Sequence, residues 1–101
     1  MGLLLALDVG NTNTVLGFFE GDVLVKTARL TTVRERTADE HALFLRAVIE
    51  GKGRTVGEVD DVIVSSVVPP QDFPIRAACR DAFGIDPLFV APGVKTGMKI
   101  L

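Results

Sequence analysis

The sequence predicts one α/β domain built on a mixed sheet of five strands. Three apolar segments separated by short polar turns open the chain, and two segments with helical apolar spacing follow, each leading into a short apolar run. The order is therefore β-β-β-α-β-α-β, with no internal repeat or linker. A length of 101 residues suits a single domain, residues 1–101. The last two strands follow helical crossovers, so we expect them to run parallel to the first.

The first two strands flank a polar turn, and the third follows a second turn. The run from 3 to 7 is apolar at every position, which indicates a central strand buried on both faces. The run from 15 to 19 reads as its antiparallel partner, and that from 23 to 30 has the mixed pattern of a strand near an edge. The stretch between the first two runs is Asp8, Val9, Gly10, Asn11, Thr12, Asn13 and Thr14.

The residue types of this first turn suit phosphate groups and a metal ion. Gly10 is expected to adopt positive φ and to let a ligand approach the backbone without meeting a Cβ. Successive backbone amides can form an anion-binding nest, to which the asparagine and threonine side chains at 11–14 add donors. Asp8 would repel phosphate but could hold Mg²⁺ through its water shell. The alternative is an ordinary hairpin turn with a solvated carboxylate.

The first helix is predicted from a capping box. Thr37 and Glu40 have the S/T-x-x-E spacing, so the helix begins here, and Gly51 and Gly53 end it. Its core face is formed by Ala38, Ala42, Leu45, Val48 and Ile49. His41, in the first turn, is expected to be a surface or half-buried structural residue.

A strand, a second helix and a last short strand complete the pattern. The strand at 62–64 ends on Ser65 and Ser66 and is stopped by two prolines. The second helix is expected to start around Phe73 and Pro74 and to end at Gly84, and residues 88–90 form the last strand. The inner face of the helix is formed by Ile75, Ala78, Cys79 and Ala82.

Charge and cysteine content exclude several classes of protein. The net charge of −2 and the absence of a long basic run give no electrostatic case for nucleic-acid binding. Cys79 is the one cysteine, so an internal disulfide and a cysteine zinc set are excluded, and we expect an inert core thiol. The apolar run at the amino terminus has no cationic region before it and is broken by Asp8. It therefore predicts neither a signal peptide nor a membrane span, and the expected location is the cytoplasm.

Four short motifs carry a resemblance to a known family. They are Asp8-Val9-Gly10-Asn11-Thr12, Arg36-Thr37-Ala38-Asp39-Glu40, Ser65-Ser66-Val67-Val68-Pro69 and Pro92-Gly93-Val94-Lys95-Thr96-Gly97. Each is weak alone, but the four in this order and spacing resemble type III pantothenate kinase. The resemblance implies the ribonuclease H-like half of the actin-like kinase fold. In that half, five strands lie in the order three, two, one, four, five, and the second strand is antiparallel.

The resemblance also implies an activity and a set of site residues. The activity is ATP-dependent phosphorylation of pantothenate to 4'-phosphopantothenate on the route to coenzyme A, with Mg²⁺, a monovalent cation (K⁺ or NH₄⁺) and a homodimer. Asp8 would lie near the metal and the nucleotide phosphates. The phosphate-binding residues would be Gly10, Asn11, Thr12, Asn13, Thr14, Ser65 and Ser66. The residues near pantothenate would be Pro92, Gly93, Lys95, Thr96 and Gly97.

The chain also departs from the family pattern. Members are longer and consist of two such halves. A Gly-x-Asp-Arg motif, whose Asp is the expected general base, and a second phosphate loop lie beyond the segment that matches 92–97. This chain stops before both, so it is expected to be an amino-terminal half whose catalytic base lies beyond Leu101.

Two other readings stay open. One is a non-catalytic half-domain that folds alone and associates with itself. The other is a different actin-like phosphotransferase, such as an acetate or sugar kinase, against which the Ser-Ser-Val-Val-Pro and Pro-Gly-x-x-Thr-Gly pairing argues.

Overall fold

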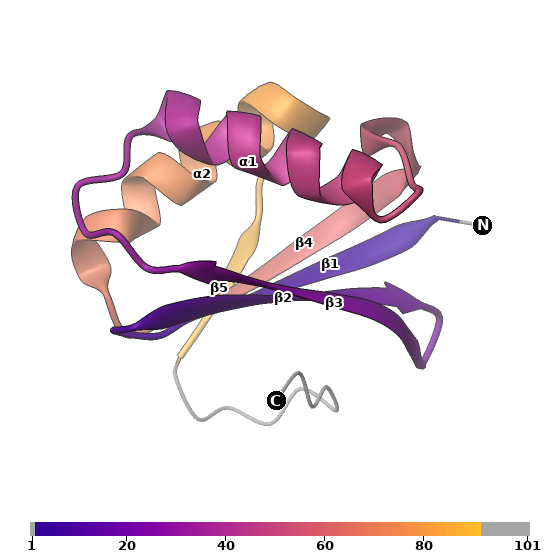
Figure 1. The fold of residues 1–101 in the computed structure, drawn as a ribbon, viewed down its shortest axis with the longest axis horizontal. Coiled ribbons are helices and arrows are strands. Elements are labelled where there is room, and N and C mark those ends of the chain that lie inside the picture. Colours follow the sequence, from indigo (N-terminus) through magenta and orange to yellow (C-terminus); the bar gives the residue numbers. More distant parts are fainter. Residues whose placement is uncertain (1, 92–101) are drawn as a thin grey trace.

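A five-stranded sheet lies beneath two helices in the computed structural model, which describes residues 2–91 (Figure 1). The strands are β1 (Leu3–Val9), β2 (Asn13–Glu20), β3 (Val23–Thr31), β4 (Val59–Ser66) and β5 (Leu88–Val90). The helices are α1 (Ala38–Gly51) and α2 (Asp72–Phe83), and the short 3₁₀ turns are η1 (Val56–Glu58) and η2 (Pro69–Gln71). The predicted order of elements is confirmed.

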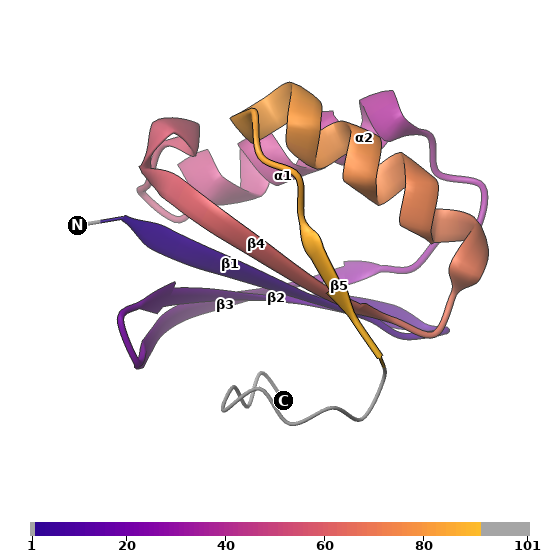
Figure 2. The ribbon, with the colours of Figure 1, turned by 180° about the vertical axis from the view of Figure 1, so that it is seen from behind.

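The strands lie in the order β3-β2-β1-β4-β5, as the sequence predicted. β1 pairs antiparallel with β2 and parallel with β4, while β2 pairs antiparallel with β3 and β4 parallel with β5. β1 is therefore hydrogen-bonded on both sides, and β3 and β5 form the two edges. Figure 2, seen from behind, shows β5 crossing beside β4 below α2.

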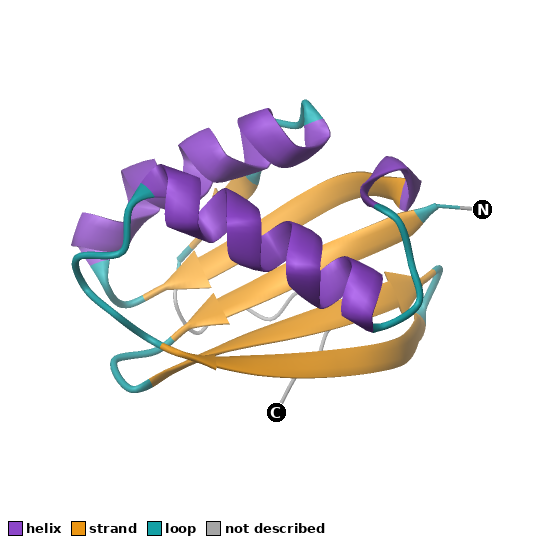
Figure 3. Ribbon diagram, turned by 45° about the horizontal axis from the view of Figure 1, so that its top comes forward, coloured by secondary structure: helices purple, strands orange, loops and turns teal. Residues whose placement is uncertain are grey.

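Both helices cover the same face of the sheet, and the core lies between them and that face (Figure 3). Side chains alternate between the two faces of a strand. Leu5, Leu7 and Val9 of β1 and Leu16 and Phe18 of β2 belong to the core. Asp8 must therefore point to the opposite face, which neither of these helices covers.

The capping box predicted for α1 is confirmed. The Glu40 amide donates to Thr37 Oγ1 at 3.2 Å, and the Thr37 amide donates to Glu40 Oε1 at 2.8 Å. These bonds satisfy two amides that the first turn of a helix otherwise leaves without partners. The pKa of Glu40 is lowered, chiefly because the Thr37 amide donates to its ionised carboxylate.

Thr37→Ala is expected to lower the free energy of unfolding by about 1 kcal/mol, because one capping acceptor is lost. Urea unfolding followed by circular dichroism measures this. Nucleotide affinity should not change, since the cap lies outside the proposed site. Thr37→Ser, which keeps the hydroxyl, is the matched control, and an unchanged unfolding curve for the alanine variant would refute the role of the cap.

Helix α2 begins slightly earlier than the sequence predicted. It starts at Asp72, directly after the η2 turn, whereas the expected start was Phe73. Pro69 and Pro70 are compatible with this because proline suits the first positions of a helical turn. Gly84 ends α2 in the left-handed conformation (φ 67°), as predicted.

The predicted inner face of α2 is buried in full. Cys79 lies within it, and burial raises the pKa of its thiol to about 12. The thiol therefore stays protonated at neutral pH and is unreactive, as expected.

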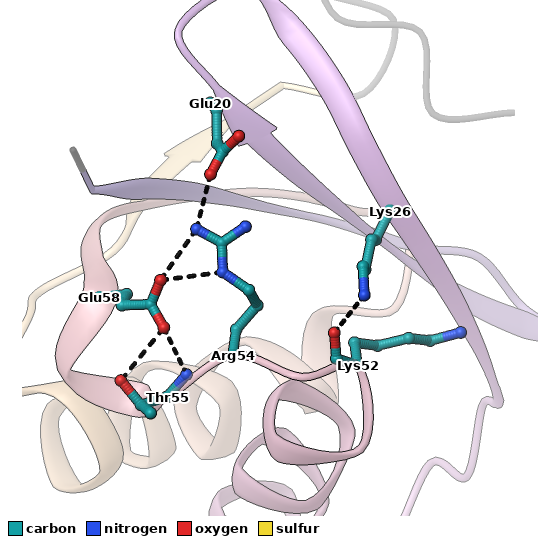
Figure 4. Close-up of polar contacts among 6 residues, drawn as sticks. All are labelled: Glu20, Lys26, Lys52, Arg54, Thr55 and Glu58. Atoms are coloured by element: carbon teal, nitrogen blue, oxygen red, sulfur yellow. Dashed lines mark hydrogen bonds and ion pairs between the residues drawn. The ribbon is translucent and has the colours of Figure 1, made fainter.

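Ion pairs and a hydrogen bond connect segments at the end of the sheet that is remote from Asp8 (Figure 4). Arg54, between α1 and η1, places Nη2 2.6 Å from Glu20 Oε2, at the end of β2. Its Nε donates to Glu58 Oε1 at 2.8 Å. Lys26 of β3 donates to the carbonyl of Lys52. These contacts tie the connection between α1 and β4 to the β2–β3 hairpin.

Candidate phosphate- and metal-binding site

The polar turn joins β1 to β2 through three residues, Gly10, Asn11 and Thr12. The Gly10 amide donates to the Asn13 carbonyl at 2.9 Å, which closes the hairpin. The Thr32 amide donates to the Thr12 carbonyl at 2.8 Å, which holds the turn against the segment after β3. The turn is therefore anchored to both neighbouring segments.

Gly10 is required for a different reason from the one expected. Among residues 2–91, positive φ occurs only at Gly21, Gly53 and Gly84, so the expectation of positive φ at Gly10 is wrong. A Cβ on Gly10 would lie 3.1 Å from the Asn13 carbonyl oxygen. That oxygen accepts the bond that closes the hairpin, so it has little freedom to move. Glycine here provides space for a tight turn rather than an unusual torsion.

An open hollow of about 270 Å³ lies beside this turn. Its lining residues are Asp8, Gly10, Thr12, Asn13, Val15 and Arg29. Four of the predicted phosphate- and metal-binding residues are thus brought together. The volume is below that typical of sites for whole drug-sized molecules and suits phosphate groups rather than a complete nucleotide.

Asp8 lies at the centre of this region because β1 is the central strand. Its cross-strand partners are Val15 on β2 and Ser65 on β4, so the three side chains share the face that α1 and α2 leave uncovered. Ser65 is therefore positioned beside Asp8, at the carboxyl end of a parallel strand. Open α/β sheets commonly bind ligands at this end.

One carboxylate in this setting fits Mg²⁺. Magnesium keeps several waters and needs only one or two protein carboxylates when substrate phosphates supply further ligands. In the described part of the chain, no three His, Cys, Asp or Glu side chains gather as a metal-binding group. Asp8 would therefore hold the ion jointly with a bound phosphate, not as part of a protein cage.

Two predicted phosphate-binding side chains lie on the other face of the sheet. Thr14 is buried, and its Oγ1 lies 2.9 Å from Thr32 Oγ1. Ser66 Oγ accepts a bond from the Val68 amide at 3.1 Å. Neither lines the hollow. Both pair with Val9, whose side chain is in the core, so strand alternation turns Thr14 and Ser66 towards the helix side. For Thr14 this follows from the start of β2 at residue 13, earlier than the sequence suggested.

The remaining predicted residues divide into two groups. Asn11 is exposed in the turn and is not among the lining residues. Pro92, Gly93, Lys95, Thr96 and Gly97 lie outside the described residues.

Arg29 lines the hollow although no motif or pattern in the sequence singles it out. It pairs across the sheet with Val15, which in turn pairs with Asp8. Only the strand register brings it to the site, because residues 8 and 29 are remote in sequence. Sequence analysis could have found Arg29 only by predicting the strand register, in which Asp8 pairs with Val15 and Val15 pairs with Arg29.

His41 is more deeply buried than expected, with 6% of its surface exposed. Its Nε2 contacts Gln71 Oε1. The Gln71 Nε2 donates to the carbonyls of Arg34 (2.6 Å) and Arg36 (3.3 Å), so the amide orientation is determined and Oε1 must face the ring. His41 Nε2 therefore carries a proton. This cluster joins the start of α1 to the β3–α1 connection and to η2.

Stability is expected to fall as pH decreases below about 6.5, in part through His41. Burial lowers the pKa of His41 in the folded state, so the unfolded chain binds a proton first. Urea unfolding at pH 7.5 and 5.5 measures the effect, in a range above most carboxyl pKa values. His41→Gln should show a smaller loss between the two pH values. An equal loss in both proteins would contradict the assignment.

Comparison with known proteins establishes the family. The profile of type III pantothenate kinase matches residues 4–101. The chain belongs to the type III pantothenate kinase family. The pantothenate kinase of Syntrophotalea carbinolica is 50% identical over 99 residues, covering 98% of this chain and 39% of that protein. That of Halalkalibacterium halodurans is 41% identical over 98 residues, covering 97% and 39%. The chain thus spans about two fifths of these kinases.

Solved structures show that this chain has the predicted fold. A ROK hexokinase from Thermus thermophilus superposes with a TM-score of 0.62 at 21% identity, covering 88% of this chain and 35% of the hexokinase. T. thermophilus RuvC in complex with a Holliday junction substrate gives 0.59 at 19% identity, covering 91% and 66%. The sheet and its helices are those of the actin-like fold. Within residues 2–91, neither helix has the length and apolarity needed to cross a membrane.

Proposed function

We propose that this chain is the phosphate-binding amino-terminal part of a kinase that transfers a phosphoryl group from ATP to pantothenate. The product is 4'-phosphopantothenate, on the route to coenzyme A, and the proposed location is the cytoplasm. Membership of the pantothenate kinase family supports the reaction. One structural observation carries the proposal: Asp8, Gly10, Thr12 and Asn13 line the same open hollow of about 270 Å³.

The predicted site residues in and beside the hollow have distinct proposed roles. Gly10 leaves room for phosphate oxygens to approach the turn, and Thr12 and Asn13 supply hydrogen-bond donors. Asp8 would hold Mg²⁺, which neutralises charge on the transferred phosphoryl group. Ser65, beside Asp8, would donate its hydroxyl to the same phosphate or to a metal-bound water. Catalysis would rest on positioning and charge neutralisation.

Other parts of the proposal extend beyond the hollow. Asn11 would add a donor from the turn, while Thr14 and Ser66 would support the hairpin and the β4 end from the core side. The segment containing Pro92, Gly93, Lys95, Thr96 and Gly97 would contact pantothenate. A monovalent cation (K⁺ or NH₄⁺) and a homodimer complete the proposed active state.

A second candidate is a half-domain that binds phosphate or associates with itself without catalysing transfer. The lining of the hollow favours it for the isolated chain. Of the lining residues within 2–91, Asp8 and Arg29 are the only ionisable ones. If Asp8 holds the metal ion, this part of the chain therefore supplies no base for the pantothenate hydroxyl.

ADP release with ATP, Mg²⁺ and K⁺, with and without pantothenate, tests the proposal. It should be measured for the purified chain and for a chimera in which this chain replaces the matching 99 residues of the S. carbinolica kinase. Pantothenate-dependent release by the chimera supports the kinase role. A folded chimera that releases no ADP, beside an active parent enzyme, would overturn it. Release by the chain alone would overturn the second candidate.

A further inference from the structure

Arg29 faces the same hollow as Asp8, from the edge strand β3. The register places Asp8 opposite Val15 and Val15 opposite Arg29, so the three form one row across the sheet. Directly opposed residues share a face of a sheet. Neighbouring strands are about 4.8 Å apart, so the Asp8 and Arg29 backbones are separated by about 10 Å. Val15, between them, is apolar and offers no hydrogen bond.

The two walls of the hollow carry opposite charges that do not neutralise each other. Among the described residues, no carboxylate lies within ion-pair distance of Arg29. By contrast, Arg46, Arg54, Arg76 and Arg80 each have a carboxylate within 4 Å. The Arg29 guanidinium, with five donors in a planar fork, is therefore available to a ligand.

A metal-chelated polyphosphate matches this arrangement. Its cation would be held from the Asp8 wall, and its anionic oxygens extend several ångströms from that cation. Arginine binds such oxygens through paired N–H donors, which add direction as well as charge. Thr12 and Asn13 line the same hollow, and their side chains can donate to the remaining phosphate oxygens.

We propose that Arg29 is a nucleotide-binding residue that contacts the phosphate oxygens of the metal-bound nucleotide, on the side of the hollow opposite Asp8. The inference rests on the proposed function, from which it takes the ligand class. The alternative is that Arg29 only discourages pairing of the exposed β3 edge with another strand, as charged residues on edge strands do. That role needs positive charge but no ligand.

Isothermal titration calorimetry distinguishes these roles. The purified chain is titrated with Mg²⁺-tripolyphosphate at constant ionic strength, and the dissociation constant is measured for each variant. Arg29→Gln should weaken binding at least tenfold, and Arg29→Lys should fall between it and the wild type, because charge is kept but the fork is lost. Arg80→Gln, the matched control, removes the same charge from α2 on the other side of the sheet and should stay within twofold. Circular dichroism checks that every variant is folded.

Two results would overturn the inference: no saturable binding by the wild type, or binding by Arg29→Gln within twofold of it. Failure of the proposed function is separate, because it is read from pantothenate-dependent ADP release. Arg29-dependent binding without ADP release by the chimera would support Arg29 and overturn the kinase role. ADP release by the chimera together with binding that does not depend on Arg29 would support the kinase role and overturn the role of Arg29.

Discussion

Replacing Asp8 by asparagine is expected to lower the pantothenate-dependent turnover of the chimera at least a hundredfold, or about 3 kcal/mol in the activation barrier. Asparagine has nearly the same shape as aspartate but no negative charge. It would hold Mg²⁺ far less well at the centre of the sheet, while the pairing of β1 with β2 and β4 would be preserved. The loss should therefore appear in turnover and not in the melting temperature.

The matched control is Asp61→Asn. Asp61 is also on the sheet, opposite Leu4 near the other end of β1, and it is exposed. Removing its charge should leave turnover within about twofold of wild type. Initial rates of ADP formation over a range of Mg²⁺ concentrations measure both variants. Near-wild-type turnover of Asp8→Asn would remove Asp8 from the site.

Phe18→Ala is expected to lower the free energy of unfolding by about 4 kcal/mol, a large part of the total of about 5–15 kcal/mol typical of a domain. Phe18 is 1% exposed and lies on the β2 face that α1 and α2 cover. It pairs with Leu5 of the central strand, so truncation opens a cavity in the middle of the core. The close-packed surroundings can only partly collapse into that space.

Phe73→Ala makes the same chemical change at an exposed position. Phe73 is 76% exposed in the first turn of α2, so its loss should change stability by no more than about 0.5 kcal/mol. Guanidinium unfolding of both variants, at equal protein concentration, measures the difference. Similar losses for the two would show that the core is not centred on β2 and β1.

Most of the fold could be predicted from local patterns. The capping box at Thr37, the left-handed Gly84 and the apolar spacing along α2 each depend on a few neighbouring residues, and the structure confirms them. Element boundaries depend also on contacts between segments. β2 begins at Asn13 because the hairpin closes between Gly10 and Asn13, and α2 begins at Asp72 because η2 leads into it.

Burial of polar residues was harder to predict. His41 and Gln71 come together from segments 30 residues apart, and each makes the burial of the other acceptable by hydrogen bonding. Periodicity predicts which residues avoid water, but it does not identify polar pairs that become buried together.

The family, the order of the elements and the identity of the polar turn could be read from the sequence, because they depend on short motifs and on the period of apolar residues. Which side chains share the hollow depends on how the strands pair. Strand register placed Arg29 across from Asp8, and strand alternation turned Thr14 and Ser66 towards the other face. Register is a relation between segments, set by packing and backbone pairing across the sheet, so no single stretch of sequence carries it.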